Sequence, residues 1–407
     1  MAESRKQIVD PPAQSKRQAV ANYLSLERNV TASSAAVFLL GLGEELWLKF
    51  LPKYLEKLGA STQVIGLFGT AEDFFDAMYQ YPGGWLADKF GRRRALLFFV
   101  AFASIGYVVY FSARSWPLIF VGLAFSMAWH SMASPVIFAV IGDSLPKERR
   151  AMGFTFQSML KRLPMIVAPL IGGALIARFG IATGLRTGFA ITLGFASISA
   201  LILTRIRIPT LASSKINIRG VWRSFHSALK RLLISDIVIR TCEGMAGVFV
   251  ILYATNIIRV TAAEYGVLVA IQMTTSLLVY IPAARIADKI GRKPFVILTF
   301  VCFALFPIAV VYSHNFTTLI FAFIVGGLRE IGEPSRKAMI VDFAEPELRA
   351  RSVGLYYLVR CLTVTPAAAI GGLLWKISPA TPFVTAGAIG FVGVIVFAIT
   401  VEERYAG

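Results

Sequence analysis

The sequence predicts an all-α membrane protein with twelve transmembrane helices, arranged as two pseudo-symmetric bundles of six helices. Three observations support this fold class. The first is composition: 56% of the 407 residues are hydrophobic and only 16% are charged, too few charges to cover the surface of a soluble protein. The second is a series of apolar segments, each long enough to cross a hydrocarbon core of roughly 30 Å. The third is an internal duplication of the chain.

Six apolar segments make up the first half of the chain. A polar stretch, residues 1–30, precedes them and is expected to form a cytoplasmic tail. Because this stretch has no signal-peptide core, we expect the first helix to target the protein to the membrane. The six segments together predict a bundle over residues 31–204. The expected spans are 31–56, 63–87, 95–113, 117–142, 152–177 and 183–204.

One long polar connection, residues 205–233, separates the two halves. Its last part, residues 222–233, places apolar residues at helical spacing among basic ones. This pattern favours an amphipathic helix on the inner membrane surface, and a flexible basic linker is the alternative. The second bundle is predicted over residues 234–401, with a cytoplasmic tail at 402–407. Its expected spans are 234–258, 263–287, 294–313, 317–342, 352–376 and 380–401.

The net charge of +18 follows the predicted topology. Most Lys and Arg residues lie in the tails and in the loops after the second, fourth, sixth, eighth and tenth segments. Basic loops of a membrane protein remain in the cytoplasm, so we expect a multi-pass protein of the cell (inner) membrane with both termini cytoplasmic. The partner of these basic residues is then anionic membrane lipid and not nucleic acid.

Motifs of soluble enzymes are missing from the sequence. It contains no Walker-type glycine loop for ATP and no Gly-x-Ser-x-Gly nucleophile elbow. The three cysteines (Cys242, Cys302 and Cys361) lie inside apolar segments and have neither a disulfide framework nor zinc-site spacing. We therefore expect no enzymatic activity, no cofactor and no resident metal.

A short block around Asp88 ends the second span, and it recurs about 200 residues later around Asp288. In both copies an apolar segment containing a proline leads to an acid, a glycine and a basic cluster. The glycine permits a tight turn, the aspartate can bond to a neighbouring helix end, and the basic residues remain among lipid headgroups. We expect the block to gate the cytoplasmic side. Its residues are Gly84, Asp88, Gly91, Arg92 and Arg93 in the first copy and Asp288, Gly291 and Arg292 in the second.

The duplicated block carries a family resemblance. The run from Gly84 to Arg93 matches Gly-x-x-x-Asp-Lys-x-Gly-Arg-Arg, so the chain resembles the major facilitator superfamily over spans 1–12, although the second copy begins with Ala284. Residues Ala168 to Gly173 partially resemble the Gly-Pro-x-x-Gly-Gly motif of its drug–proton antiporters. The resemblance implies alternating access around a central cavity. It also implies that spans 3, 6, 9 and 12 lie outside the cavity wall.

Acids within the spans are candidates for proton coupling, because ionisable groups are costly in a bilayer. Glu72 and Asp76 are four residues apart, so they face the same way on one helix. Two close carboxylates do not readily both ionise in a low dielectric, so one can carry a proton near neutral pH. Glu44 aligns with Glu243 of the second half, and His130 is either a proton relay or a satisfied polar residue. Asp76 ranks first among these candidates for the proton site. Its counterpart in the second half, Ser276, is uncharged, so the duplicated scaffold does not require an acid at this position.

Basic residues within the spans have two interpretations. Arg162 and Arg360 either neutralise buried acids or bind an anionic group, and Lys161 is expected to snorkel to the inner interface. Arg329 and Glu333 are four residues apart, so an intrahelical ion pair competes with a substrate role. The substrate-binding candidates are Glu44, Trp47, Tyr79, Trp129, Arg162, Arg329, Glu330, Glu333 and Arg360.

These residues predict a secondary active transporter of a small molecule. Embedded acids outnumber embedded bases and aromatic side chains accompany them, which favours proton-coupled export of a cationic or amphipathic organic compound by a monomer. Two alternatives stay open. One is an organic anion clamped by Arg162, Arg329 and Arg360. The other is a divalent metal held by Glu44, Asp76, His130 and Glu243.

Overall fold

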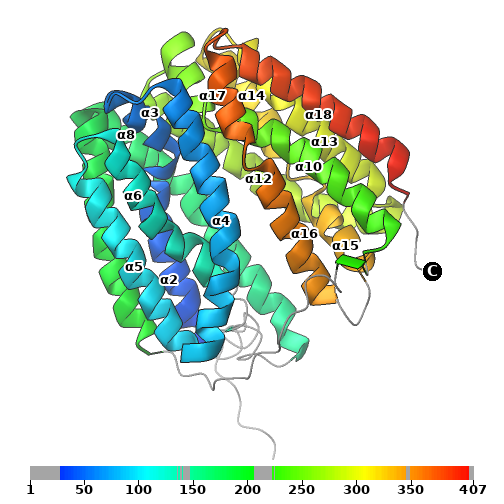
Figure 1. Ribbon diagram of the computed structural model, residues 1–407, viewed down its shortest axis with the longest axis horizontal. Helices are drawn as coiled ribbons and strands as arrows, with labels where there is room; N and C mark the ends of the chain where they lie inside the picture. Colours follow the sequence, from blue (N-terminus) through cyan, green and yellow to red (C-terminus); the bar gives the residue numbers. More distant parts are fainter. Residues whose placement is uncertain are drawn as a thin grey trace, which may run out of the picture.

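A computed structural model describes residues 28–134, 136–137, 140, 147–205, 222–223, 225–344 and 349–402. Helices dominate these residues, and no strand occurs among them. Figure 1 shows two groups of helices side by side, the first half in blue to green and the second half in green to red. The predicted all-α fold of two helical bundles is therefore confirmed.

The helices of the first half follow the predicted spans. In chain order they are α2 (Arg28–Glu45), η1 (Leu48–Phe50), α3 (Leu51–Lys57), α4 (Thr62–Phe90), α5 (Arg92–Ser112), α6 (Trp116–Met127), η2 (Ala128–Met132) and α8 (Lys147–Leu203). The last holds two spans, because Gly180 adopts a φ of 79° that breaks the helix and redirects the chain. The π-helical turn η2 contains Trp129 and His130, and such turns occur frequently at functional sites.

The second half repeats this arrangement with more interruptions. Its helices are α10 (Ser227–Gly247), α11 (Val250–Leu252), η3 (Tyr253–Ile257), α12 (Ala262–Ile290), α13 (Lys293–Val311), α14 (Phe316–Leu328), α15 (Glu333–Asp342), α16 (Arg349–Val364), α17 (Ala367–Trp375) and α18 (Thr381–Thr400). Seven helices of the described part are long and apolar enough to cross a membrane by themselves. The other predicted spans are divided by turns, as at residues 329–332 between α14 and α15, or carry embedded charges, as in α4.

Several predicted segments lie outside the described residues. They are the tail up to residue 27, most of the connection (206–221), and residues 403–407. Of the expected amphipathic helix, Trp222 and Arg223 are helical, and the Trp222 ring packs 5.1 Å from the Phe225 ring. Helix α10 begins at Ser227, inside the predicted connection.

The two halves pack closely at the end of the bundles remote from Arg28 and Gly91. A Cβ atom added to Gly66 on α4 would lie 2.6 Å from the carbonyl oxygen of Ala368 on α17. A Cβ atom added to Gly173 on α8 would lie 2.5 Å from the carbonyl oxygen of Ala262 on α12. In Figure 1, α17 meets α4 near the top, whereas α16 runs away from α4 toward the bottom. Glycine thus permits backbone contact that closes this end.

Replacing Gly173 with leucine should open this end. Overpacking typically costs about 1–3 kcal/mol, which favours the state in which this end is open. A single cysteine in place of Met273, which lines the cavity between the halves, should then react about fivefold faster with an impermeant maleimide added on this side. This single-cysteine variant should be made in a protein from which Cys242, Cys302 and Cys361 have been removed. Gly194→Leu, on the second span of α8 after the break at Gly180, is the matched control, because a Cβ at Gly194 meets no atom within 4 Å. Equal labelling rates in the two variants would contradict the proposed closure.

Candidate functional site

A cavity of about 330 Å³ lies between the two halves. Lys49 and Glu72 line it from the first half, and Glu243, Arg329 and Glu330 line it from the second. Aromatic rings cover much of the remaining wall. They belong to Phe68, Tyr265, Phe303, Phe306 and Phe323. The cavity therefore combines charged groups of both signs with aromatic surface, a composition suited to a small organic ligand.

The cavity wall corrects one expectation about the helices. Phe303 and Phe306 belong to α13, which corresponds to the ninth span and was expected to lie outside the wall. Both rings face the guanidinium of Arg329, with centroids 4.9 and 4.7 Å from its central carbon. Stacking on this cation explains why α13 contributes to the cavity.

In the first half, Glu44 and His130 come together as predicted candidates. The Tyr107 hydroxyl donates to Glu44 Oε1 at 2.6 Å, and His130 Nδ1 lies 4.0 Å from Glu44 Oε2. Both residues line a small pocket of about 50 Å³ together with Lys161. Lys161, which was expected to snorkel to the interface, is exposed and also lines this pocket beside Glu44.

Glu45 also lines this small pocket. Its residue surface is only 6% exposed, and its Oε2 atom has no hydrogen-bond partner among the described residues. Unsatisfied buried polar atoms are uncommon and costly in proteins. Glu45 therefore joins Glu44 as a candidate for ion coupling in the first span.

Three neighbouring acids in the middle of α4 have different surroundings. Asp76 Oδ1 accepts a hydrogen bond of 2.7 Å from the Ser131 hydroxyl. Glu72 lines the central cavity and makes no hydrogen bond or ion pair within the described part of the chain. Asp73 faces the second half, since its Oδ2 atom lies 3.9 Å from the position of a Cβ on Gly244. Glu72 is therefore the acid most available to a ligand in the cavity.

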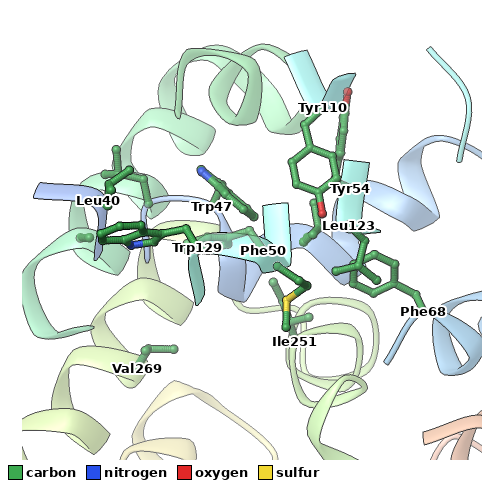
Figure 2. Close-up of a cluster of buried hydrophobic side chains, with 14 of the residues drawn as sticks. Leu40, Trp47, Phe50, Tyr54, Phe68, Tyr110, Leu123, Trp129, Ile251 and Val269 are labelled. Carbon is green, nitrogen blue, oxygen red and sulfur yellow. The ribbon is translucent and has the colours of Figure 1, made fainter. Parts of the chain in front are cut away.

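The predicted aromatic candidates mainly pack helices together. Trp47 is buried, its indole Nε1 donates to Thr192 Oγ1 at 3.0 Å, and its ring contacts Tyr110 at 5.4 Å. Figure 2 shows Trp47 within a cluster of buried side chains that also contains Trp129. The Tyr79 hydroxyl donates to the Ala124 carbonyl at 2.8 Å. Of these three candidates, Trp129 reaches the small pocket beside His130.

The second half contains a buried ion-pair network that sequence reasoning missed. Asp236 is fully buried and its Oδ2 atom accepts from Arg336 at 2.5 Å, from Tyr356 at 3.0 Å and from Arg360 at 3.3 Å. Glu333 accepts from Arg336 at 2.6 Å and from Arg240 at 3.3 Å. The available signal was the spacing of Asp236 and Arg240, four residues apart on α10.

The intrahelical pair between Arg329 and Glu333, one of the two interpretations of their spacing, does not form. Residues 329–332 make a turn between α14 and α15, so the i,i+4 geometry of a continuous helix is lost. Arg329 instead donates to Glu243 Oε1 at 3.3 Å and to the Gly326 carbonyl at 2.8 Å. The aligned acid Glu243 is also bound by Arg240 at 2.7 Å.

These pairs bear on the two alternative cargoes. Each arginine of the expected anion clamp already bonds to a carboxylate: Arg162 to Glu330 at 3.2 Å, Arg329 to Glu243 at 3.3 Å, and Arg360 to Asp236 at 3.3 Å. Within the described ranges, no group of three or more His, Cys, Asp or Glu side chains is placed to hold a metal ion. Among the described residues, the geometry therefore offers neither alternative a prepared site.

The duplicated block around Asp88 and Asp288 lies at two helix junctions, as expected. Gly91 and Gly291 adopt φ values of 85° and 112°, which allow the turns between α4 and α5 and between α12 and α13. Arg292 Nη1 donates to Asp342 Oδ2 at 2.5 Å, which joins the second copy to the end of α15. The side chains of Asp88 and Asp288 lie outside the described residues.

Comparison with known proteins is consistent with this architecture. The family model described as Major Facilitator Superfamily matches residues 34–242 and 232–407. The chain is 22% identical over 369 residues to the uncharacterized MFS-type transporter MJ1317 of Methanocaldococcus jannaschii, covering 89% of this chain and 92% of the relative.

Two further similarities are more limited. The quinolone resistance protein NorA of Staphylococcus aureus is 23% identical over 144 residues, or 35% of this chain and 37% of NorA. The crystal structure of the nucleoside transporter NupG superposes with a TM-score of 0.77 at 14% identity, covering 92% of this chain and 100% of that chain. At this identity the superposition establishes the fold alone.

Proposed function

The chain belongs to the major facilitator superfamily, and from this premise we propose that it is a proton-coupled exporter of a cationic or amphipathic organic compound. Members of this family are transporters and not enzymes. The cargo, the coupling ion and the direction are the proposed parts. We further propose that the protein works as a monomer in the cell membrane, with its basic loops and both termini on the cytoplasmic side.

The observation that carries the cargo proposal is the excess of carboxylates in the cavity wall. Three carboxylates line it (Glu72, Glu243 and Glu330) against two cations (Lys49 and Arg329), and Glu72 makes no salt bridge among the described residues. A carboxylate beside aromatic rings attracts a cation that carries an apolar body. The partial match to a quinolone resistance protein is further support for export of an organic compound.

An uptake experiment in proteoliposomes tests the proposal. Vesicles that are acidic inside should accumulate ethidium, an aromatic cation, and a protonophore should abolish this accumulation. Glu72→Gln should reduce ethidium uptake about tenfold, because it removes a charge that a bound cation would contact at low dielectric. Lys376→Gln serves as the control, because this exposed lysine at the end of α17 lies outside the cavity. Uptake of the aromatic anion p-aminohippurate in place of ethidium would contradict the proposed cargo class.

A further inference from the structure

One ion pair joins the two halves beside the cavity. Arg162 lies on α8 of the first half, and its Nη2 atom donates to Glu330 Oε2 at 3.2 Å. Its Nη1 atom donates to Ser276 Oγ at 3.0 Å, and its guanidinium lies 4.5 Å from the ring centroid of Tyr280. The three partners all belong to the second half. A single cation of one half is therefore bound by an anion, a hydroxyl and a ring face of the other.

Glu330 differs from the other cavity carboxylate of the second half. Glu243 is bound by Arg240 and Arg329, both from its own half. Within the described residues, the ion pair of Glu330 comes from Arg162 of the opposite half. Glu330 also lines the central cavity, so a cation in the cavity can approach its carboxylate. Arg162 and such a cation would compete for the same negative charge.

Exposure makes this pair easier for a ligand to displace than the fully buried pairs of the second half. The side chains of Arg162 and Glu330 are 25% and 32% exposed, whereas those of Arg336 and Asp236 are 1% and 0% exposed. A partly hydrated ion pair is weak, because water screens the attraction and solvates each partner after separation. Breaking a fully buried pair instead leaves an uncompensated charge in low dielectric. A cavity ligand can therefore exchange with Arg162 but not with Arg336.

We propose that Arg162 occupies the place of the cargo on Glu330 while the cavity is empty, and that an organic cation displaces it. The inference rests on the proposed cationic cargo and adds the specificity-determining contact. Without Glu330, Arg162 retains one hydroxyl and one ring face in the second half, and neither carries a charge. Cargo binding to Glu330 therefore weakens the contact that Arg162 makes between the two halves. A neutral compound cannot replace Arg162 on Glu330, because it carries no positive charge.

Equilibrium binding of ethidium to the purified full-length protein tests this competition. Arg162→Gln removes the competing cation, so we expect the Kd for ethidium to fall about fivefold, the scale of an exposed ion pair. Glu330→Gln should raise the Kd. Arg178→Gln is the matched control, because Arg178 lies on the same helix, is exposed and contacts Phe179 away from the cavity. Its Kd should equal that of the wild type.

Different results separate the inference from the proposed function. An unchanged or higher Kd in Arg162→Gln, with normal binding by the wild type, overturns the competition and leaves the cationic cargo standing. An unchanged Kd in Glu330→Gln overturns it as well, and this variant gives the answer if Arg162→Gln does not fold. If the wild type itself binds no ethidium, the proposed cargo class fails first.

Discussion

Replacing Asp76 with asparagine should abolish the accumulation of cargo driven by a proton gradient, while exchange of cargo across the membrane continues. Asparagine keeps an oxygen that can accept the 2.7 Å hydrogen bond from Ser131, so the local packing is preserved. Its amide cannot take up or release a proton at physiological pH, so the coupling step is lost. The measurement is uptake into proteoliposomes with and without a pH gradient, beside counterflow of labelled cargo.

Glu44→Gln is the matched comparison for Asp76→Asn. The glutamine can still accept from the Tyr107 hydroxyl, and the substitution again removes one embedded carboxylate from the first half. We expect this variant to retain gradient-driven uptake. If Asp76→Asn accumulates cargo normally and Glu44→Gln does not, the proton site belongs to the first span, where Glu45 is its buried neighbour.

Replacing Asp236 with asparagine should cause the largest loss of stability. Its carboxylate neutralises Arg336, which is 1% exposed, and it also accepts from Tyr356 and Arg360. Removing one partner of a buried ion pair typically costs about 3–5 kcal/mol, because the remaining charge stays in low dielectric. The expected result is a clearly lower thermal unfolding midpoint and lower yield in detergent, measured at one heating rate and one detergent concentration.

Two further variants test the cause of this destabilisation. Lys337→Ala removes a cation from the same network, but Lys337 is 52% exposed and lies 3.5 Å from Glu333, so it should cost about 1 kcal/mol or less. Combining Asp236→Asn with Arg336→Met should recover part of the lost stability, because the fully buried cation that Asp236 neutralised is then removed as well. A midpoint in Asp236→Asn equal to that in Lys337→Ala would show that the network does not stabilise the second half.

The helical segments could be predicted because their signals are local. Apolar length determined the spans, and glycine determined the junctions at Gly91 and Gly291, where the backbone adopts positive φ values. The duplication predicted that the second half would repeat the first, and the helices follow that order. Each of these features depends on contiguous residues or on a comparison of one segment with another.

The pairing of charges could not be predicted in the same way. The i,i+4 spacing of Arg329 and Glu333 indicated a pair, but the turn at 329–332 separates them and Arg329 binds Glu243 instead. Arg162 appeared available to an anion, yet its partner Glu330 lies 168 positions away. Membership of Asp236 in the buried network likewise depends on α10, α15 and α16 meeting at one point.

By itself the sequence determined the class of protein, the order of the spans and the presence of costly charges within them, because hydropathy and turn chemistry act over neighbouring residues. Only the tertiary structure decided which of those charges are neutralised. That depends on distances between helices far apart in the chain, since the interaction of two ions in a low dielectric changes steeply over a few ångströms. In the sequence, Glu72 and Arg162 are both charges within predicted spans. Packing places Glu72 at the cavity and pairs Arg162 with Glu330.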